Sequence, residues 1–224
     1  MTNILVIGGT GTLGTAICKA YISAGAEVWF TYKTNLAKAQ QLMRAGAKGY
    51  FKFDTVLDVL YPPFTISHYI DASGADRPRS FNEVTTDDLR FVFENNIIGP
   101  FRAAKQALNH MGNNGSMTFF SSSSVDSGGP RSIHYAASKA GVEAMVKGLA
   151  RFASGRCIRV NAVSPGYIVS ETTEGTMSPA VAQQISGILL MRLGKPSEVA
   201  DAVVWLGQAT YVNGQIVKVN GGMI

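Results

Sequence analysis

Short apolar runs alternate with helix-spaced segments along all 224 residues of the chain, and this alternation restricts its possible folds more than any other feature. Seven runs have the length and composition of strands: residues 3–7, 27–32, 48–53, 67–70, 116–120, 157–162 and 215–219. The segments with helical spacing are residues 12–24, 36–43, 86–111, 132–153 and 196–207. Strands joined through helices pair in parallel and are covered on both faces. We therefore expect an α/β fold, a doubly wound parallel sheet of about seven strands with helices on both faces.

Several predicted helices carry signals at their ends. Asn35 is placed to cap the helix at 36–43, and Thr85 with Asp88 predicts a capping box at the start of 86–111. Gly99-Pro100 predicts a break within that helix. No repeat, low-complexity tract or linker divides the chain, so we expect residues 1–224 to form a single domain.

A glycine-rich turn, Gly8-Gly9-Thr10-Gly11-Thr12-Leu13-Gly14, joins the first strand to the first helix. Gly8 permits a tight turn, the small residues let the backbone approach a pyrophosphate, and Gly14 lets the helix pack closely on the strand. The helix N-terminus offers unpaired N–H groups and a partial positive charge to the phosphates. We expect a Rossmann-like fold whose dinucleotide is bound by Gly8, Thr10, Gly11, Thr12, Leu13 and Gly14. A structural turn without a ligand is the alternative.

The end of the second strand carries the residue that distinguishes the two nicotinamide dinucleotides in such folds. An acidic side chain there accepts from the 2′-hydroxyl of NAD, whereas a basic side chain suits the 2′-phosphate of NADP. The strand here runs into Lys33 and contains no acid at this end. We predict NADP(H) in preference to NAD(H), with an ordinary solvated lysine as the alternative reading of Lys33.

Tyr135 and Lys139 lie one helical turn apart, on the same face of the helix at 132–153. A free phenol has a pKa of about 10. A neighbouring ammonium and a bound cationic nicotinamide in a dry pocket could lower the pKa to about 7. Tyr135 could then protonate a carbonyl oxygen, or deprotonate an alcohol in the reverse direction. Four serines at 121–124 end the fifth strand and place a hydroxyl where it could align the reacting oxygen.

Together these motifs resemble the short-chain dehydrogenase/reductase family in its single-domain branch, and within it the 3-oxoacyl-carrier-protein reductase-like members. The resemblance covers essentially the whole chain. The family's serine precedes its tyrosine by thirteen positions, which selects Ser122, and its helical asparagine corresponds to Asn96. The resemblance implies that Asn96, Ser122, Tyr135 and Lys139 are catalytic, with Asn96 holding a water that links Lys139 to solvent. It also implies that the cofactor contacts Asp54, Ser73, Gly74, Tyr135, Lys139, Pro165, Gly166, Ile168 and Ser170.

Three features depart from the family pattern. The glycine spacing resembles the larger epimerase branch, because Thr12 stands where the single-domain branch has glycine, but the chain has no room for a second domain. Asp71-Ala72-Ser73-Gly74 replaces the usual Asn-Asn-Ala-Gly. The short stretch between Asp54 and Asp71 contains Pro62-Pro63, so the crossover is expected to lack a full helix. One face of the sheet would then be open, or covered by a partner subunit.

Residues 167–190 are expected to form a mobile lid over a largely apolar substrate pocket. This segment contains no lysine or arginine, and its apolar members are Met177, Ile185, Ile188, Leu189 and Leu190. The predicted function is hydride transfer between NAD(P)(H) and a ketone or secondary alcohol, as an NADPH-dependent carbonyl reductase of the 3-oxoacyl type. The substrate would be a small-molecule or acyl-carrier-bound carbonyl compound. A non-catalytic nucleotide-sensing or interaction protein on the same fold is the alternative.

Composition argues against several other classes of protein. The chain is 46% hydrophobic and 16% charged, unlike a disordered chain, and no apolar run is long enough to span a membrane. The basic residues behind the net charge of +5 are scattered, which argues against nucleic-acid binding. The 2 cysteines and 3 histidines lack ligand spacing, so no metal site is predicted. We expect a cytoplasmic homotetramer or homodimer, built partly from the helices at 86–111 and 132–153.

Overall fold

Seven strands form one parallel sheet in the computed structural model of the chain, which describes residues 2–170, 173, 175 and 178–223. Their order across the sheet is β3-β2-β1-β4-β5-β6-β7. The strands are β1 (Asn3–Ile7), β2 (Glu27–Tyr32), β3 (Gly49–Lys52), β4 (Ile66–Asp71), β5 (Met111–Phe120), β6 (Arg159–Pro165) and β7 (Ile216–Val219). The expected doubly wound sheet is therefore confirmed. The other strand ends differ by at most two residues, and the largest differences are in β5, which begins at Met111 and pairs there with Ile66 before a register shift, and in β6, which continues to Pro165.

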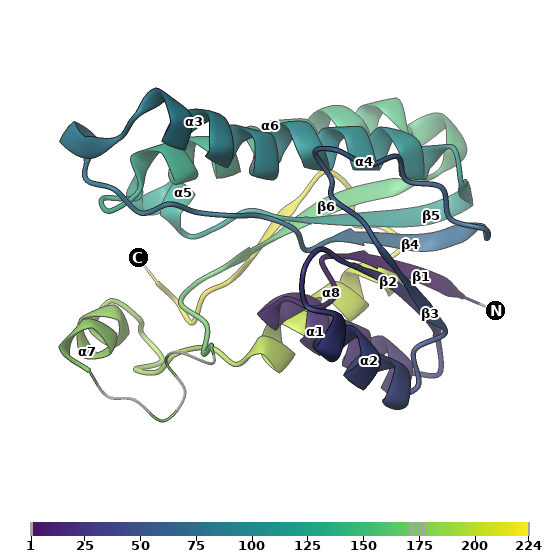
Figure 1. Ribbon diagram of the computed structural model, residues 1–224, viewed down its shortest axis with the longest axis horizontal. Helices are drawn as coiled ribbons and strands as arrows, with labels where there is room; N and C mark the ends of the chain where they lie inside the picture. Colours follow the sequence, from purple (N-terminus) through teal and green to yellow (C-terminus); the bar gives the residue numbers. More distant parts are fainter. Residues whose placement is uncertain (1, 171–172, 174, 176–177, 224) are drawn as a thin grey trace.

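Helices cover both faces of the sheet, as Figure 1 shows. One layer holds α1 (Thr12–Ser23), α2 (Leu36–Arg44) and α8 (Pro196–Gln208), and the other holds α3 (Thr86–Phe93), α4 (Gly99–Leu108) and α6 (Ile133–Phe152). Strand β1 supplies both layers, because successive side chains point to opposite faces. Ile4 and Val6 pack with the α1 layer, whereas Leu5 and Ile7 pack with the α6 layer. Each such fully buried side chain contributes about 1.5–3 kcal/mol.

The predicted helix at 86–111 is divided into three parts. Thr85 caps α3, and its side chain and that of Asp88 form the expected capping box. A π-helical turn, η2 (Glu94–Ile98), separates α3 from α4, and Pro100 lies in the first turn of α4. The chain therefore changes its helical winding just before Gly99-Pro100 and continues in the same direction. Single π-helical turns of this kind are frequent at functional sites.

The crossover from β3 to β4 contains no helix, as the two prolines predicted. An extended segment replaces the helix and covers this part of the sheet. The Leu60 side chain is buried, and its backbone N–H donates to Gln106 Oε1 on α4 at 2.7 Å. The ring of Phe64 stacks on Trp29 of β2, with ring centroids 4.7 Å apart. These side chains fill the space that a crossover helix would otherwise occupy.

Four short elements were not expected from the sequence: η1 (Phe81–Glu83), α5 (Ser124–Ser127), η3 (Ser154–Arg156) and α7 (Pro179–Ser186). Helix α7 lies within the expected lid, and Val181 on it packs with Ile188 and Leu193 in a separate apolar cluster. Leu189 and Leu190 are exposed, and Met177 lies outside the described residues. In the part of the chain that the structure describes, no helix has the length and apolarity needed to cross a membrane.

Candidate active site

The candidate site lies at the carboxyl ends of β1 and β4, between which the chain reverses its direction of travel across the sheet. The glycine turn follows β1. Gly8 has a φ of +72°, which favours glycine. A Cβ atom on Gly14 would collide with the carbonyl oxygen of Gly8 and lie 2.8 Å from Cα of Gly9. The turn thus brings the first turn of α1 directly onto the strand end, with its N–H groups unpaired within the helix.

The outer part of the cleft is a cavity of about 350 Å³ beside the end of β2. Of the residues predicted to bind the cofactor, it is lined by Gly8, Thr10, Gly11, Lys33, Asp54, Ser73 and Gly74. Lys33 Nζ lies 2.7 Å from Asp54 Oδ2, so the lysine expected to bind the 2′-phosphate is ion-paired with Asp54, a second residue expected to contact the cofactor. Burial alone would raise the pKa of Asp54. The hydrogen bonds from Lys33 and from the Val56 backbone outweigh it and lower that pKa below its usual value.

The inner part of the cleft is a cavity of about 300 Å³ that shares Ala72, Ser73 and Gly74 with the outer part. Its predicted members are Leu13, Ser73, Gly74, Ser122, Tyr135, Lys139, Pro165, Gly166 and Ile168. Three of the residues predicted to bind the cofactor lie elsewhere. Thr12 and Ser170 line a neighbouring groove between α1 and α2, and Gly14 lies beneath the turn that it packs against. The two parts form one continuous cleft with room for an extended ligand, along a floor of glycine and small residues.

Tyr135 and Lys139 project from α6 into the inner cavity. Lys139 Nζ lies 5.7 Å from the centre of the Tyr135 ring and donates a hydrogen bond to the Phe120 carbonyl oxygen at 2.9 Å. Burial lowers the pKa of Lys139 to about 8, while the charge of Asp71 acts in the opposite direction.

The expected downward shift in the pKa of Tyr135 does not arise from the protein alone. Burial raises this pKa, a hydrogen bond with Ser122 lowers it, and the charge of Asp76 raises it further. The reason is that the phenol is largely removed from water. Any lowering must therefore come from a positive charge that binds beside it.

Asn96 lies in the π-helical turn, behind Gly74. Its Oδ1 accepts from the Ala75 N–H at 2.8 Å, and its Nδ2 donates to the Ala75 carbonyl at 2.9 Å and to Ser138 Oγ at 2.9 Å. A Cβ on Gly74 would lie 3.0 Å from Asn96 Oδ1 and 3.3 Å from Lys139 Nζ. The described contacts of the Asn96 side chain therefore hold the segment after β4 against Lys139.

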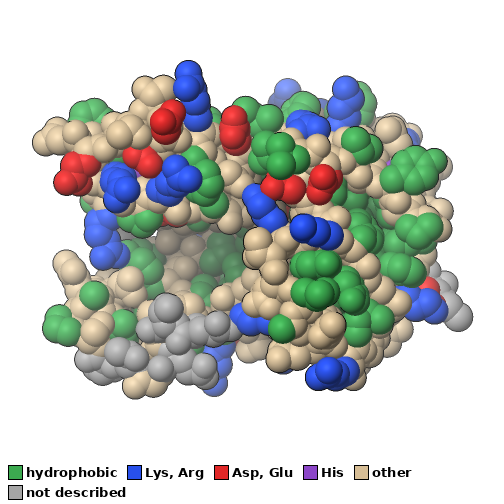
Figure 2. Space-filling model, viewed as in Figure 1, with side chains coloured by type: hydrophobic (Ala, Val, Ile, Leu, Met, Phe, Trp, Pro, Cys, Tyr) green, Lys and Arg blue, Asp and Glu red, His purple; other side chains and the backbone are tan. Residues whose placement is uncertain are grey.

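A further cavity of about 410 Å³ opens next to Tyr135 and Ser122. Figure 2 shows the molecule hollowed on this face, between the α3–α6 layer and the α7 segment. The residues around the cavity are Asp76, Pro78, Ser122, Ser123, Ser124, Ser127, Gly129, Pro130, Arg131, Ser132, Tyr135, Gly166, Tyr167 and Met223. Several serines and two charged residues, Asp76 and Arg131, take part in this lining, and the lid residues Val181, Ile185 and Ile188 pack in their own cluster. The expectation of a largely apolar pocket under a mobile lid stays a prediction.

A family model described as enoyl-(acyl carrier protein) reductase matches residues 65–224. The cyclic-di-GMP-binding biofilm dispersal mediator protein of Escherichia coli K12 is 30% identical to this chain, over 97% of the chain and 95% of that protein. The chain belongs to the short-chain dehydrogenase/reductase family. Membership in this family makes it an NAD(P)-dependent oxidoreductase.

Two further short-chain dehydrogenase/reductase relatives bear on the cofactor and substrate. The 3-oxoacyl-[acyl-carrier-protein] reductase FabG of Thermotoga maritima is 36% identical, over 69% of this chain and 65% of that protein. The crystal structure of BdcA in complex with NADPH is 28% identical, with a TM-score of 0.92, and covers 99% of this chain and 94% of that one.

The short-chain dehydrogenase/reductase pattern is altered at Asp71, which is buried. Its Oδ2 accepts from the Tyr69 hydroxyl at 2.8 Å, and its Oδ1 accepts from the backbone N–H of Ser73 at 3.1 Å. Burial raises the pKa of Asp71, and hydrogen bonds from the Ser73 hydroxyl, the Tyr69 hydroxyl and the Ser73 N–H oppose the rise. The altered segment therefore keeps an ordered turn toward Ser73 and Gly74, with the acid beneath it.

Sequence reasoning missed Asp76 and Arg131, which line the cavity beside Tyr135, whereas Tyr167, also in this lining, belongs to the expected lid at 167–190. Asp76 stands two residues after Gly74, and that place after the fourth strand was a usable signal. Arg131 lies in the irregular segment between α5 and α6, whose path the sequence pattern does not fix, so no such signal was available for it.

Proposed function

We propose that this short-chain dehydrogenase/reductase is an NADP(H)-dependent carbonyl reductase in which Tyr135 exchanges a proton with the substrate oxygen. A bound reduced nicotinamide would supply the hydride. The observation that carries the proposal is the meeting of Ser122, Tyr135 and Lys139 at one cavity, continuous with a cleft floored by the glycine turn. Nothing in the site favours the non-catalytic alternative.

Each side chain has a distinct role in this proposal. The Tyr135 hydroxyl donates its proton to the carbonyl oxygen as that oxygen gains charge, and the Ser122 hydroxyl aligns the same oxygen. The Lys139 ammonium stabilises the phenolate that is left behind. Asn96 acts through the backbone at Ala75, which it holds by two hydrogen bonds, and so positions the cleft beside Lys139. The expected water between Asn96 and Lys139 remains part of the proposal.

The cleft residues fit a nicotinamide dinucleotide. Gly8, Thr10 and Gly11 offer a backbone surface without bulky side chains to the pyrophosphate. Lys33 and Asp54 would hold the adenosine end, and Ile168 with Pro165 and Gly166 would hold the nicotinamide end. The basic Lys33 and the NADPH complex of the similar BdcA structure support NADP(H) over NAD(H).

The proposed substrate is a small ketone or a 3-oxoacyl group on a carrier protein. The similarity to the Thermotoga maritima 3-oxoacyl-[acyl-carrier-protein] reductase supports the second form. The cavity of about 410 Å³ beside Tyr135 is large enough for either reacting group. We place the activity in the cytoplasm, where both NADPH and carrier-bound acyl groups would be accessible.

The test begins with separate fluorescence titrations of the purified protein with NADPH and NADH. NADPH oxidation is then followed with a ketone panel, a 3-oxoacyl thioester and a 2-enoyl thioester. We expect NADPH to bind more tightly and a carbonyl compound to be reduced. Tyr135→Phe should keep cofactor binding and lose at least about a hundredfold in turnover. The exposed Tyr211→Phe should match the wild type.

Three results would contradict the proposal. The first is failure of both dinucleotides to bind. The second is full turnover by Tyr135→Phe. The third is reduction of the 2-enoyl thioester with no carbonyl compound reduced, which would assign the site to enoyl reduction instead.

A further inference from the structure

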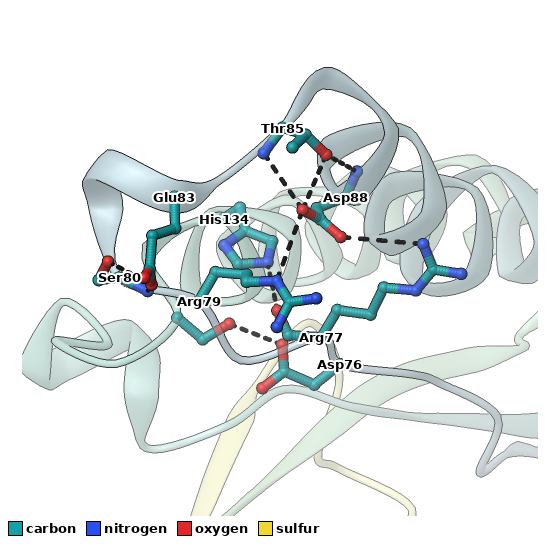
Figure 3. Close-up of polar contacts among 9 residues, drawn as sticks. Asp76, Arg77, Arg79, Ser80, Glu83, Thr85, Asp88 and His134 are labelled. Carbon is teal, nitrogen blue, oxygen red and sulfur yellow. Dashed lines mark hydrogen bonds and ion pairs between the residues drawn. The ribbon is translucent and has the colours of Figure 1, made fainter.

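Asp76 brings a carboxylate into the cavity that also holds Ser122 and Tyr135. One of its oxygens is engaged, because Ser132 Oγ donates to Asp76 Oδ1 at 2.6 Å. Figure 3 shows the other oxygen without a partner among the residues drawn. None of the described residues donates a hydrogen bond to that second oxygen. The carboxylate is therefore anchored at one oxygen and open at the other.

The backbone on both sides of Asp76 is fixed by buried side chains. Ala75 is held through both its N–H and its carbonyl by Asn96. The carbonyl of Arg77 accepts from His134 Nε2 at 3.1 Å (Figure 3), and His134 is buried on α6. Ser132, which holds the Asp76 side chain, is also buried. Such an arrangement preorganises a polar group for a ligand, since little freedom is left to lose on binding.

The charge of Asp76 is not neutralised by the arginines around it. Arg77 and Arg79 point to Asp88, at 3.8 Å and 3.9 Å from its carboxylate oxygens (Figure 3). Arg131 lines the same cavity, and no ion pair joins it to Asp76 in the described part of the chain. The negative charge of Asp76 raises the pKa of the Tyr135 hydroxyl. The negative charge therefore acts close to the reacting atoms.

We propose that Asp76 determines which carbonyl compounds are reduced, because its free oxygen accepts a hydrogen bond from a donor group, a hydroxyl or an ammonium, next to the carbonyl. This inference rests on the proposed reductase function and narrows its substrate class. A donor at that position satisfies the second carboxylate oxygen as a hydrogen-bond acceptor. A carboxylate at the same position would meet a like charge, so 2-oxo acids are poor substrates.

The test uses four ketones of one carbon skeleton: butanone, 1-hydroxybutan-2-one, 1-aminobutan-2-one and 2-oxobutanoate. Their kcat and KM values are measured with NADPH for the wild type and for Asp76→Asn, which keeps the size and the Ser132 contact but removes the charge. Asp87→Asn, on the exposed surface of α3, is the matched control. Binding of 1-aminobutan-2-ol to the NADP-loaded protein is measured by calorimetry, as a readout independent of turnover.

We expect the wild type to favour the hydroxy or amino ketone over butanone by about tenfold in kcat/KM, mainly through KM, with 2-oxobutanoate poorest. If both the hydroxy and the amino ketone are preferred over butanone, Asp76 acts as a hydrogen-bond acceptor. If only the amino ketone is preferred, Asp76 acts mainly through its charge. Asp76→Asn should remove the preference and raise kcat/KM for 2-oxobutanoate, whereas Asp87→Asn should change neither.

Equal use of butanone and its hydroxy and amino forms, unchanged in Asp76→Asn, would overturn this inference and leave the reductase function standing. If none of the four ketones is reduced, the proposed function is contradicted for this substrate class, and calorimetry alone decides the role of Asp76. Binding of 1-aminobutan-2-ol that weakens in Asp76→Asn supports the carboxylate as its acceptor. Equal binding, or no binding, by both proteins overturns it.

Discussion

At the scale of single residues, the most unusual group is Lys139, an ammonium in a buried position. Burial lowers its pKa from 10.5 to about 8, and the neighbouring charge of Asp71 partly opposes that shift. Between these values the unfolded chain holds a proton that the folded chain has released, so the stability of the folded state rises with pH. Below about pH 8 the full cost of the buried charge is present. The active site thus carries a stability cost that the proposed catalysis requires.

We predict that the unfolding free energy of the wild type, relative to that of Lys139→Met, rises by about 2 kcal/mol between about pH 7 and about pH 9.5. Urea unfolding at each pH measures it. Lys147→Met, on the exposed side of the same helix, should give a difference that is flat with pH. A flat difference for Lys139→Met as well would show that its ammonium is not held in a charge-disfavouring site.

A second residue-scale prediction concerns Lys33, whose ammonium contacts Asp54 at 2.7 Å and remains half exposed. Lys33→Ala should weaken NADPH binding by about tenfold, because a charge-assisted contact to the 2′-phosphate is lost, and should leave NADH binding almost unchanged. Asp54→Asn should strengthen NADPH binding, since it frees the ammonium from its ion pair. Fluorescence titration measures each constant, with Lys52→Ala at the exposed end of β3 as control. Unchanged NADPH binding in Lys33→Ala would contradict the predicted phosphate contact.

Some residues of the candidate site were predictable from the sequence, and others were not. Tyr135 and Lys139 were predictable because a helix fixes the direction of residues one turn apart. Ser122 was singled out among four adjacent serines only by its distance from Tyr135 in the family pattern. The place of Asp76 after β4 was a usable signal, but the direction of its side chain was not predictable because it depends on a contact with Ser132, far along the chain.

At the scale of elements, the glycine turn and α1 form a unit whose packing depends on a missing side chain. Gly14→Ala would place a Cβ against two backbone positions, at Gly8 and Gly9, that cannot move without moving β1. We predict a loss of about 1–3 kcal/mol in unfolding free energy together with weaker NADPH binding.

Gly148→Ala is the matched control for Gly14→Ala, because this exposed glycine of α6 has open space where its Cβ would lie. Removing a glycine from a helix interior should stabilise the protein by about 0.5–1 kcal/mol. Urea unfolding of both variants measures the contrast. Equal effects of the two substitutions would mean that close packing of α1 on β1 is not required.

The boundaries of elements were predicted correctly where local chemistry sets them. The prediction failed where tertiary contacts set them. The capping box at Thr85 and the helix-free crossover were predicted from residue types alone. The π-helical turn at Glu94–Ile98 was not, because backbone winding there is coupled to the contacts of Asn96 with Ala75 and Ser138. The early start of β5 depends on pairing with β4, which no local signal reports.

At the scale of the whole molecule, two groups among the exposed apolar side chains lie on separate faces, while others, such as Phe81, Phe152 and Leu189, lie elsewhere. On the α3–α4 face they are Leu89, Phe93, Ile98 and Phe101, continued by Leu57, Val59 and Tyr61 of the crossover segment. The crossover adjoins this face because Leu60 is hydrogen-bonded to Gln106 of α4. On the α8 face they include Trp205 and Tyr211. Apolar groups of this size are costly to leave in water, so each face is a candidate contact between subunits.

We therefore predict a homotetramer that uses both faces, or a homodimer that uses one of them. Phe101→Asp places a charge in the α3–α4 face, and Trp205→Asp places one in the α8 face. Both side chains are about half exposed, so each subunit should fold normally. Multi-angle light scattering should give the wild type as a tetramer and each variant as a dimer, because each substitution disrupts one face and leaves the other.

If the wild type is a dimer, only the variant in the face that is used should become a monomer. Leu36→Asp, an exposed apolar position on α2 outside both faces, should leave the mass unchanged. A wild type that stays monomeric at every concentration would contradict the prediction.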